Sequence, residues 1–137
     1  MTNHLIPKII EIPKIGSTNI GYISIAEYEK QVPFEIKRVY WTYYTPQDVV
    51  RGGHAHKKLY QLIFAISGHI TFTIKNKQEE VSVFELTEPN KGLLLTPNIW
   101  REIKFSHNAV LLCLASEMYD ESDYIRDYAE FIKLSKV

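Results

Sequence analysis

Residues 51–68 have the sequence RGGHAHKKLYQLIFAISG, in which two histidines flank one alanine and an apolar run follows. Side chains two positions apart in a β-strand point to the same face, so His54 and His56 are expected to project into one space. Gly52 and Gly53, directly before them, permit backbone conformations or close approaches that a side chain would block. Two imidazoles on one wall of a β-sheet can bind a metal ion or transfer protons.

Short runs of strand-forming residues, separated by turn residues, make up most of the chain on either side of this segment. In a longer run, residues 34–44, alternation places Arg38 and Tyr40 on one face and Val39 and Trp41 on the other. The other strands are expected at residues 20–25, 59–66, 70–74, 81–86, 93–96, 100–105 and 109–115. Eight or nine strands without an intervening helix predict an all-β jelly roll, an antiparallel sandwich or β-barrel, in a single domain over residues 1–137.

The two ends of the chain differ from this pattern. Near the C-terminus, Ser122 is a suitable N-cap, and Ile125 and Ile132 recur at helical spacing, so a short C-terminal helix is expected there. At the N-terminus, the apolar run at residues 5–12 is expected to pair with a second copy of the chain across a dimer.

Composition and charge restrict the classes of function. The 137 residues include 16 basic and 16 acidic side chains, so no global field would attract nucleic acid or an anionic membrane. No stretch of about 18 apolar residues could span a bilayer. Residues 1–10 lack the apolar core of a signal peptide, so the cytoplasm is the expected location. The single cysteine, Cys113, lies in an apolar run and is expected to be a small buried hydrophobic residue.

Cationic side chains surround the two histidines. Arg51 precedes them and Lys57 and Lys58 follow, a cluster that suits a substrate carrying phosphates. Arg51 would also favour neutral imidazoles, the form that a base requires. The plain alternative is a pair of half-exposed strand histidines beside a solvated lysine edge. The same-face spacing after a glycine pair favours a functional site.

The segment at residues 54–68 resembles the first signature of the cupin superfamily, H-x-H-x(3,4)-E-x(6)-G. Metal-binding cupins carry a glutamate where this chain has Gln61, and they supply another histidine from a second signature. That second region corresponds to residues 97–102, which contain Arg101 and no histidine. A neutral amide binds a divalent cation weakly and an arginine repels it, so no metal is expected. Glu102 keeps a metal site open as an alternative.

Three separate motifs occur in order: PFEIKRVY at residues 33–40, RGGHAHKK at 51–58 and ASEMYDESDYIR at 115–126. Together they resemble the sugar nucleotide 3,4-ketoisomerases over nearly the whole chain. The resemblance implies a homodimeric cupin-type jelly roll that binds a dTDP-linked 4-keto-6-deoxyhexose in each barrel, without a metal or another cofactor. It implies an isomerisation that moves the ketone from C4 to C3 through an enediol, on the route to 3-amino-3,6-dideoxy sugars. The paired histidines His54 and His56 are then the catalytic residues.

Eight other side chains are assigned to substrate binding: Arg38, Tyr40, Arg51, Lys57, Lys58, Gln61, Trp100 and Arg101. Arg38 is expected to contact the diphosphate and Tyr40 a hydroxyl near the sugar, whereas the plain alternative for Arg38 is a surface cation. Trp100 and Arg101 are expected to stack on the base or to clasp the sugar or diphosphate. Their plain alternative is a core tryptophan beside a salt-bridged arginine. The acidic segment at residues 119–123 is assigned to C-terminal packing.

The configuration of the product and the type of reaction both have alternatives. In the resembling group an arginine after the tryptophan is typical of gluco products and a histidine of galacto products, so Arg101 favours the gluco configuration at C4. The rival functions are a sugar nucleotide 3,5-epimerase, which would also abstract a proton next to a carbonyl, and a non-catalytic sugar-binding cupin. Solvent-deuterium labelling separates the isomerase from the epimerase.

Overall fold

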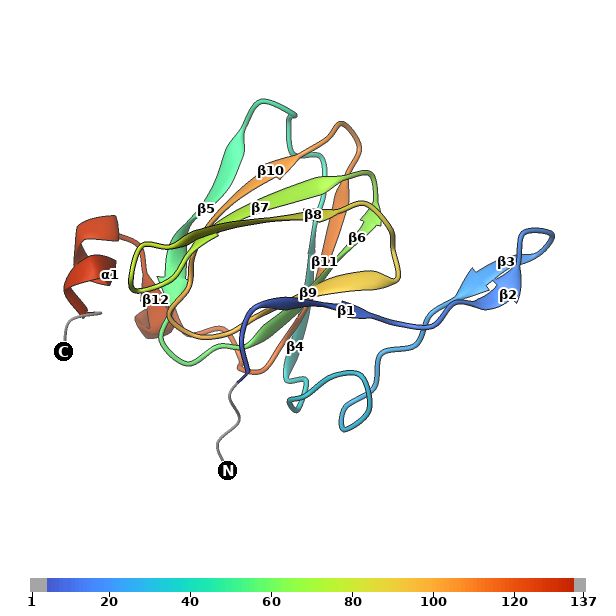
Figure 1. Cartoon of the computed structure of the whole chain (residues 1–137), viewed down its shortest axis with the longest axis horizontal. Helices are drawn as coiled ribbons and strands as arrows, with labels where there is room; N and C mark the ends of the chain where they lie inside the picture. Colours follow the sequence, from blue (N-terminus) through green and yellow to red (C-terminus); the bar gives the residue numbers. More distant parts are fainter. Residues whose placement is uncertain (1–4, 135–137) are drawn as a thin grey trace.

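The computed structural model describes residues 5–134, and two facing antiparallel β-sheets form its body (Figure 1). The strands of the first sheet are, in order, β1 (Lys8–Glu11), β9 (Lys91–Leu95), β6 (Gln61–Ser67), β11 (Val110–Ala115) and β4 (Arg38–Thr42). Those of the second are β12 (Tyr124–Ile125), β5 (Val50–His56), β10 (Trp100–Phe105), β7 (Ile70–Lys75) and β8 (Val81–Leu86). The all-β jelly roll is confirmed as a two-sheet sandwich. Within residues 5–134 no strand ladder joins the sheets into a closed barrel.

The alternation of side chains along the strands builds a core between the two sheets. On β7, Ile70, Phe72 and Ile74 are buried while the residues between them are partly exposed, as expected for a strand with one face on a core. The inward side chains of β6, β9, β10 and β11 meet them there. Cys113 lies fully buried in this core, which confirms the expectation for the single thiol. Burial raises its pKa to about 11, so the thiol stays protonated at neutral pH.

The strand β11 is apolar on both faces and needs cover on both. On its outer face, Leu112 and Leu114 pack with Ile12, Val32 and Phe34 in a second apolar cluster. The segment that leads into β4 therefore covers part of the outer face of the first sheet.

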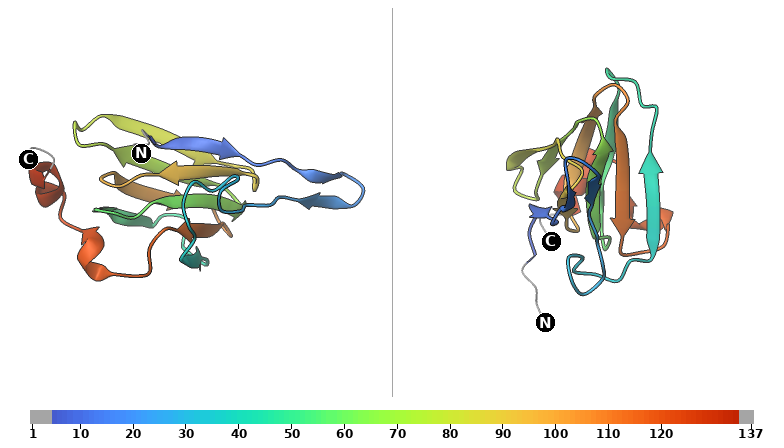
Figure 2. Two further views of the ribbon diagram at one scale, coloured as in Figure 1. Left: turned by 90° about the horizontal axis from the view of Figure 1, so that it is seen from below. Right: turned by 90° about the vertical axis from the view of Figure 1, so that its right-hand side faces the viewer.

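A two-stranded hairpin, β2 (Ile15–Ser17) and β3 (Gly21–Ile23), extends away from the body of the sandwich (Figure 2). Its apolar side chains are exposed, with Ile20 at the turn 84% accessible and Ile23 64% accessible. In the preceding run, β1 lies antiparallel to β9 and forms an edge of the first sheet. Pairing of this run across a dimer stays a prediction.

The C-terminal segment differs from the helix predicted to start after Ser122. The cap is Asp120, whose side chain accepts a hydrogen bond from the Ser122 amide at the start of a 3-10 turn, η1 (Glu121–Asp123). The chain then forms the edge strand β12 against β5, and the helix α1 (Tyr128–Leu134) begins only after it. The extended conformation gains backbone hydrogen bonds to β5 and buries Ile125, which is 1% exposed. No helix within residues 5–134 is long and apolar enough to cross a membrane.

Candidate active site

A cavity of about 280 Å³ lies between the two sheets and collects polar side chains from several distant strands. β4 contributes Arg38 and Tyr40, β5 contributes Arg51 and His54, β6 contributes Gln61 and β10 contributes Arg101. Six of the ten residues predicted for the site thus line one cavity. Tyr124 and Arg126, from the C-terminal segment, also line it.

The two histidines of β5 contact each other directly. Their ring centroids are 4.9 Å apart with an interplanar angle of 86°, an edge-to-face arrangement. His54 is half-buried and lines the cavity, whereas His56 is only 2% exposed and lies behind it. The predicted proximity of the pair is confirmed, and the structure adds a difference in depth between its members.

Of the two glycines before the histidines, Gly52 allows β5 to lie close to β10. Both have positive φ angles, +90° at Gly52 and +68° at Gly53, and the register between the strands shifts at this point. A Cβ at Gly52 would lie 2.8 Å from the Arg101 carbonyl oxygen, whereas at Gly53 it would meet nothing within 4 Å. The expected close approach is therefore present at Gly52, and it sets Arg101 opposite His54.

Burial keeps both imidazoles neutral. Desolvation, and after it the Arg101 guanidinium, lower the pKa of His54 to about 4 and that of His56 to about 2. The sequence pointed to Arg51 as the cation with this effect, but the strongest cationic influence comes from Arg101. Burial lowers the pKa of Arg101 itself to about 10, so it remains charged at neutral pH. The site therefore holds two neutral bases beside a buried cation.

A chain of hydrogen bonds crosses the floor of the cavity through Gln61. The side-chain amide of Gln61 donates to the Tyr40 hydroxyl at 2.8 Å and to the Cys113 sulfur at 3.4 Å, and its oxygen accepts from Arg101. Arg101 also donates to the Ile99 carbonyl oxygen at 3.1 Å. An amide can donate and accept at once, whereas the glutamate of metal-binding cupins, when ionised, only accepts. Gln61 thus serves a protein hydrogen-bond network at a position that metal cupins use for a ligand.

The donor set does not suit a metal ion. Among residues 5–134 no group of three or more His, Cys, Asp or Glu side chains could hold one. Next to the two histidines stand a neutral amide and a buried guanidinium, which repels a divalent cation. The absence of a metal stays a prediction that elemental composition can test.

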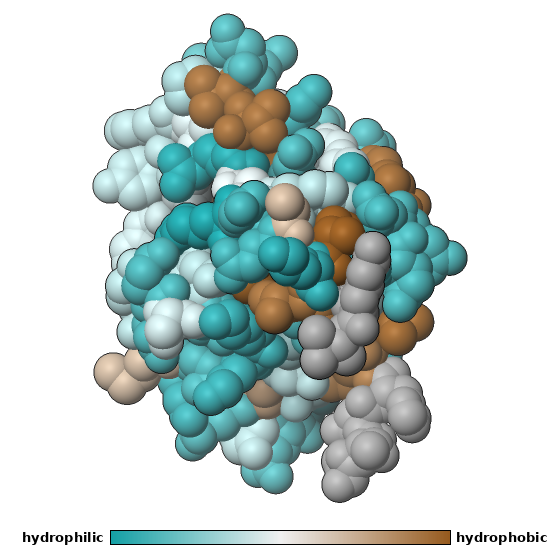
Figure 3. All heavy atoms as spheres, turned by 90° about the vertical axis from the view of Figure 1, so that its left-hand side faces the viewer, coloured by the Kyte–Doolittle hydropathy of each residue, from teal (hydrophilic) through white to brown (hydrophobic). Residues whose placement is uncertain are grey.

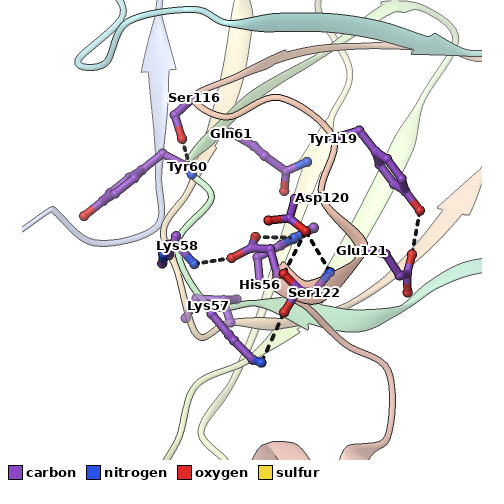
Figure 4. Close-up of polar contacts among 12 residues, drawn as sticks. His56, Lys57, Lys58, Tyr60, Gln61, Ser116, Tyr119, Asp120, Glu121 and Ser122 are labelled. Carbon is purple, nitrogen blue, oxygen red and sulfur yellow. Dashed lines mark hydrogen bonds and ion pairs between the residues drawn. The ribbon is translucent and has the colours of Figure 1, made fainter.

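The C-terminal segment contributes two side chains that were not predicted for the site: Asp123, which was assigned to packing, and Tyr124. Asp123 Oδ2 lies 3.1 Å from His56 Nδ1, and its Oδ1 accepts from the Lys58 amide at 2.7 Å. The Tyr124 ring contacts both imidazoles, with centroid distances of 4.3 Å to His56 and 5.1 Å to His54. Figure 4 shows the segment from Tyr119 to Ser122 lying near His56, the last residue of β5, and Lys57, which follows it. The signal in the sequence was the acidic and aromatic composition of residues 119–124.

Besides His56, three predicted site residues lie outside this cavity. Lys57 donates to the Ser122 carbonyl oxygen at 3.2 Å, and Lys58 borders a separate cavity of about 390 Å³. Trp100 packs under α1, with its ring centroid 5.1 Å from that of Tyr128 and 5.8 Å from that of Phe131. Trp100 is thus a core tryptophan, as the plain alternative in the sequence analysis had it. Arg101 differs from that alternative, because it is buried and forms no salt bridge within the described residues.

The sequence of the chain matches a known protein family and a characterised relative. Residues 6–136 match the family model described as FdtA: WxcM-like, C-terminal. The chain is 39% identical over 127 residues to the TDP-4-oxo-6-deoxy-alpha-D-glucose-3,4-oxoisomerase of Aneurinibacillus thermoaerophilus, a match that covers 92% of this chain and 90% of the relative.

Two solved structures are similar in both fold and sequence. One is the sugar 3,4-ketoisomerase QdtA from Thermoanaerobacterium thermosaccharolyticum in complex with TDP, with 38% identity and a TM-score of 0.90 over 95% of this chain and 94% of the other. The other is the WlaRB TDP-quinovose 3,4-ketoisomerase from Campylobacter jejuni, with 41% identity and a TM-score of 0.87 over 93% of this chain and 97% of the other.

Proposed function

Because the chain belongs to the family described as FdtA: WxcM-like, C-terminal, we propose that it is a sugar nucleotide 3,4-ketoisomerase. Its substrate is dTDP-4-keto-6-deoxyglucose, and its product carries the ketone at C3. The observation that supports this most strongly is the pair of neutral imidazoles in edge contact beside a buried guanidinium, in a relative of proteins named for the same reaction.

The reaction needs a base and a cation. A proton leaves C3 and the C4 carbonyl oxygen gains one, which gives an enediol. A proton is then delivered to C4, and the C3 hydroxyl loses its proton as the C3 ketone forms. No atom is gained or lost overall. A C–H next to a carbonyl is weakly acidic, so an unprotonated base and a stabiliser of the oxyanion both lower the barrier.

His54 is the proposed base for C3. It is the histidine that lines the cavity, and its lowered pKa keeps the imidazole unprotonated at neutral pH. His56 lies behind it in ring contact and is the proposed partner for the transfers between O3 and O4. We base these roles on the burial of the two rings: they share one face of β5, but only His54 lines the cavity.

Arg101 is the proposed stabiliser of the enediolate. It lines the cavity and is 1% exposed. No carboxylate among the described residues forms a salt bridge with it. A buried positive charge without a protein counter-charge is free to interact with negative charge that develops on the substrate. Arg38, Arg51 and Arg126, which also line the cavity, are proposed to bind the diphosphate. Arg101 further supports the gluco configuration at C4 of the product.

We also propose that the protein is a homodimer. The hairpin formed by β2 and β3 exposes Ile15, Ile20 and Ile23. The outer face of the first sheet also has a cavity of about 650 Å³ with apolar side chains in its lining. Tyr22 of this hairpin and Leu112 of β11 border it. The end of the molecule that carries α1 is mostly hydrophilic, with small separate hydrophobic patches (Figure 3). A second copy covering the hairpin side would bury this apolar surface. The cytoplasmic location and the lack of a cofactor stay predictions.

The test is incubation of the protein with dTDP-4-keto-6-deoxyglucose in deuterated water, followed by NMR. The expected product has its ketone at C3 and deuterium at C4. The H4–H5 coupling of the product formed in ordinary water reports the C4 configuration. Label at C3 and C5 with the ketone still at C4 would identify an epimerase instead. Saturable binding of the nucleotide sugar without any turnover would identify a binding protein.

A further inference from the structure

We propose that Asp123 is a positioning residue for catalysis: its carboxylate fixes the proton of His56 on Nδ1 and thereby leaves Nε2 as the nitrogen that can accept a proton. The inference deepens the proposed isomerase function and rests on it. It assigns a task to a segment that the sequence suggested was there for packing.

The geometry supplies the first argument. Asp123 Oδ2 lies 3.1 Å from His56 Nδ1, and the imidazole is 2% exposed while the carboxylate side chain is 12% exposed. The other oxygen, Oδ1, accepts from the Lys58 amide at 2.7 Å, and the Asp123 carbonyl oxygen accepts from the Lys57 amide at 2.9 Å. The carboxylate is thus held by the backbone that directly follows His56, so its distance and direction relative to the ring are fixed.

The protonation states of the His56 imidazole and the Asp123 carboxylate decide which nitrogen carries the proton. Burial and the Arg101 cation keep the pKa of His56 far below neutrality, so its ring carries one N–H rather than two. An ionised carboxylate has no proton to donate and can only accept. The contact therefore requires that Nδ1 carry the hydrogen, and the lone pair resides on Nε2. A carboxylate behind an imidazole has the same orienting effect in the Ser-His-Asp triad, where it selects the tautomer.

The rest of the segment has its own anchors, which separates positioning from loop stability. Asp120 accepts from the Ser122 amide at 3.0 Å and from the Ser122 hydroxyl at 2.7 Å. Glu121 pairs with Arg126 at 2.7 Å. Among the described residues, the Asp123 oxygen that faces His56 makes no other hydrogen bond or ion pair, so its interaction is directed at the histidine.

The deciding variant is Asp123→Asn. An asparagine can keep an oxygen toward the Lys58 amide only by turning its NH₂ toward His56, which would place the ring proton on Nε2. We expect kcat to fall about 100-fold with KM changed less than about threefold, because substrate contacts are untouched and the tautomer is wrong. Nitrogen-15 NMR of histidine-labelled protein should show His56 protonated on Nδ1 in the parent and shifted toward Nε2–H in the variant.

Two controls keep the result interpretable. Asp120→Asn, in the same turn, should retain kcat and the His56 tautomer. In a His56→Asn background, Asp123→Asn should cause little further loss, because the aspartate acts through that ring. Should Asp123→Asn fold poorly, Asp123→Glu serves instead and is expected to preserve the Nδ1–H tautomer and more of the activity than asparagine.

Two measurements, the tautomer of His56 and the loss of kcat, decide the role of Asp123. A variant that keeps the parent tautomer, or a loss of the same size in the His56→Asn background, would overturn the positioning role. So would equal losses in the Glu and Asn variants. If the parent protein fails to convert dTDP-4-keto-6-deoxyglucose, the proposed function fails, while the tautomer measurement on the resting protein still decides what Asp123 does to His56.

Discussion

At the scale of single residues, His54 and His56 differ in how they meet the cavity. We expect His54→Asn to lower kcat by about 10³-fold, within the range for loss of a positioned general base, because asparagine cannot take the C3 proton. His56→Asn should also lower kcat strongly, and it should cost about 1–3 kcal/mol of stability by leaving a buried carboxylate contact unmade. Turnover assays and thermal unfolding measure the two effects. Near-normal activity in both variants would contradict the proton-transfer mechanism.

Arg101 acts on charge in two ways, and a single variant, Arg101→Met, tests both. Loss of the guanidinium should lower kcat about 100-fold or more, as for removal of an oxyanion stabiliser. It should also raise the pKa of His54 above its parent value of about 4, because the cation that opposes the imidazolium is gone.

NMR titration of the His54 ring protons measures the second effect. Arg51→Met is the matched control, since Arg51 also lines the cavity but is exposed and is not among the main causes of the lowered pKa of His54. An unchanged His54 pKa in Arg101→Met would mean that burial alone keeps the ring neutral.

At the scale of secondary-structure elements, the junction of β5 and β10 depends on one glycine of a pair. Gly52→Ala would place a Cβ 2.8 Å from the Arg101 carbonyl oxygen at a φ of +90°, so we expect a lower melting temperature and lower activity. Gly53→Ala meets nothing within 4 Å and should cost only the left-handed backbone conformation, about 1–2 kcal/mol. Circular dichroism melts of both proteins make the comparison. Equal destabilisation would show that the contact with Arg101 does not matter.

Strands were readable from the sequence where one face meets the core. Alternation placed β8 and β10 with the bounds that the structure has, and it placed Arg38 and Tyr40 on the inward face of β4. Residues 122–127 were misassigned because helical spacing is a local signal, whereas pairing with β5 is a tertiary contact that gives β12 its extended form.

The candidate site was predicted in part for the same reason. The histidine pair and Gln61 follow from local spacing. Asp123 reaches His56 across 67 positions of sequence, and only the pairing of β12 with β5 brings them together. Trp100 carries no mark in the sequence that distinguishes a base-stacking ring from one that packs under a helix.

At the scale of the whole molecule, the exposed hairpin predicts the state of assembly. The parent should sediment as a dimer of twice the 16.0 kDa chain mass. Ile20→Asp with Ile23→Asp should shift it toward the monomer, because two charges would replace apolar side chains that we expect to be buried between copies. Val83→Asp, an exposed position on β8, is the control and should leave the mass unchanged. A parent that sediments as a monomer would contradict the dimer.

The two neutral histidines also make the stability of the whole fold depend on pH. Their pKa values in the folded protein, about 4 and about 2, lie below the ordinary value of about 6.5 expected in the unfolded chain. Their contribution is fully present above about pH 6.5 and is lost as the pH falls toward the folded values, since the unfolded chain then binds protons that the folded chain does not. Each histidine should lower the free energy of unfolding by up to about 1.4 kcal/mol per pH unit in this window.

Urea unfolding between pH 7 and pH 5, followed by tryptophan fluorescence at one protein concentration, measures this slope. The His56→Asn variant, which lacks one of the two groups, should show a shallower slope than the parent, whatever its stability at pH 7. Glu121, whose pKa is lowered to about 2 by its hydrogen bonds to Arg126 and Tyr119, titrates below this window in both proteins and cancels in the comparison. Parallel slopes for parent and variant would show that His56 binds its proton equally well in the folded and unfolded chains, which its burial beside Arg101 argues against.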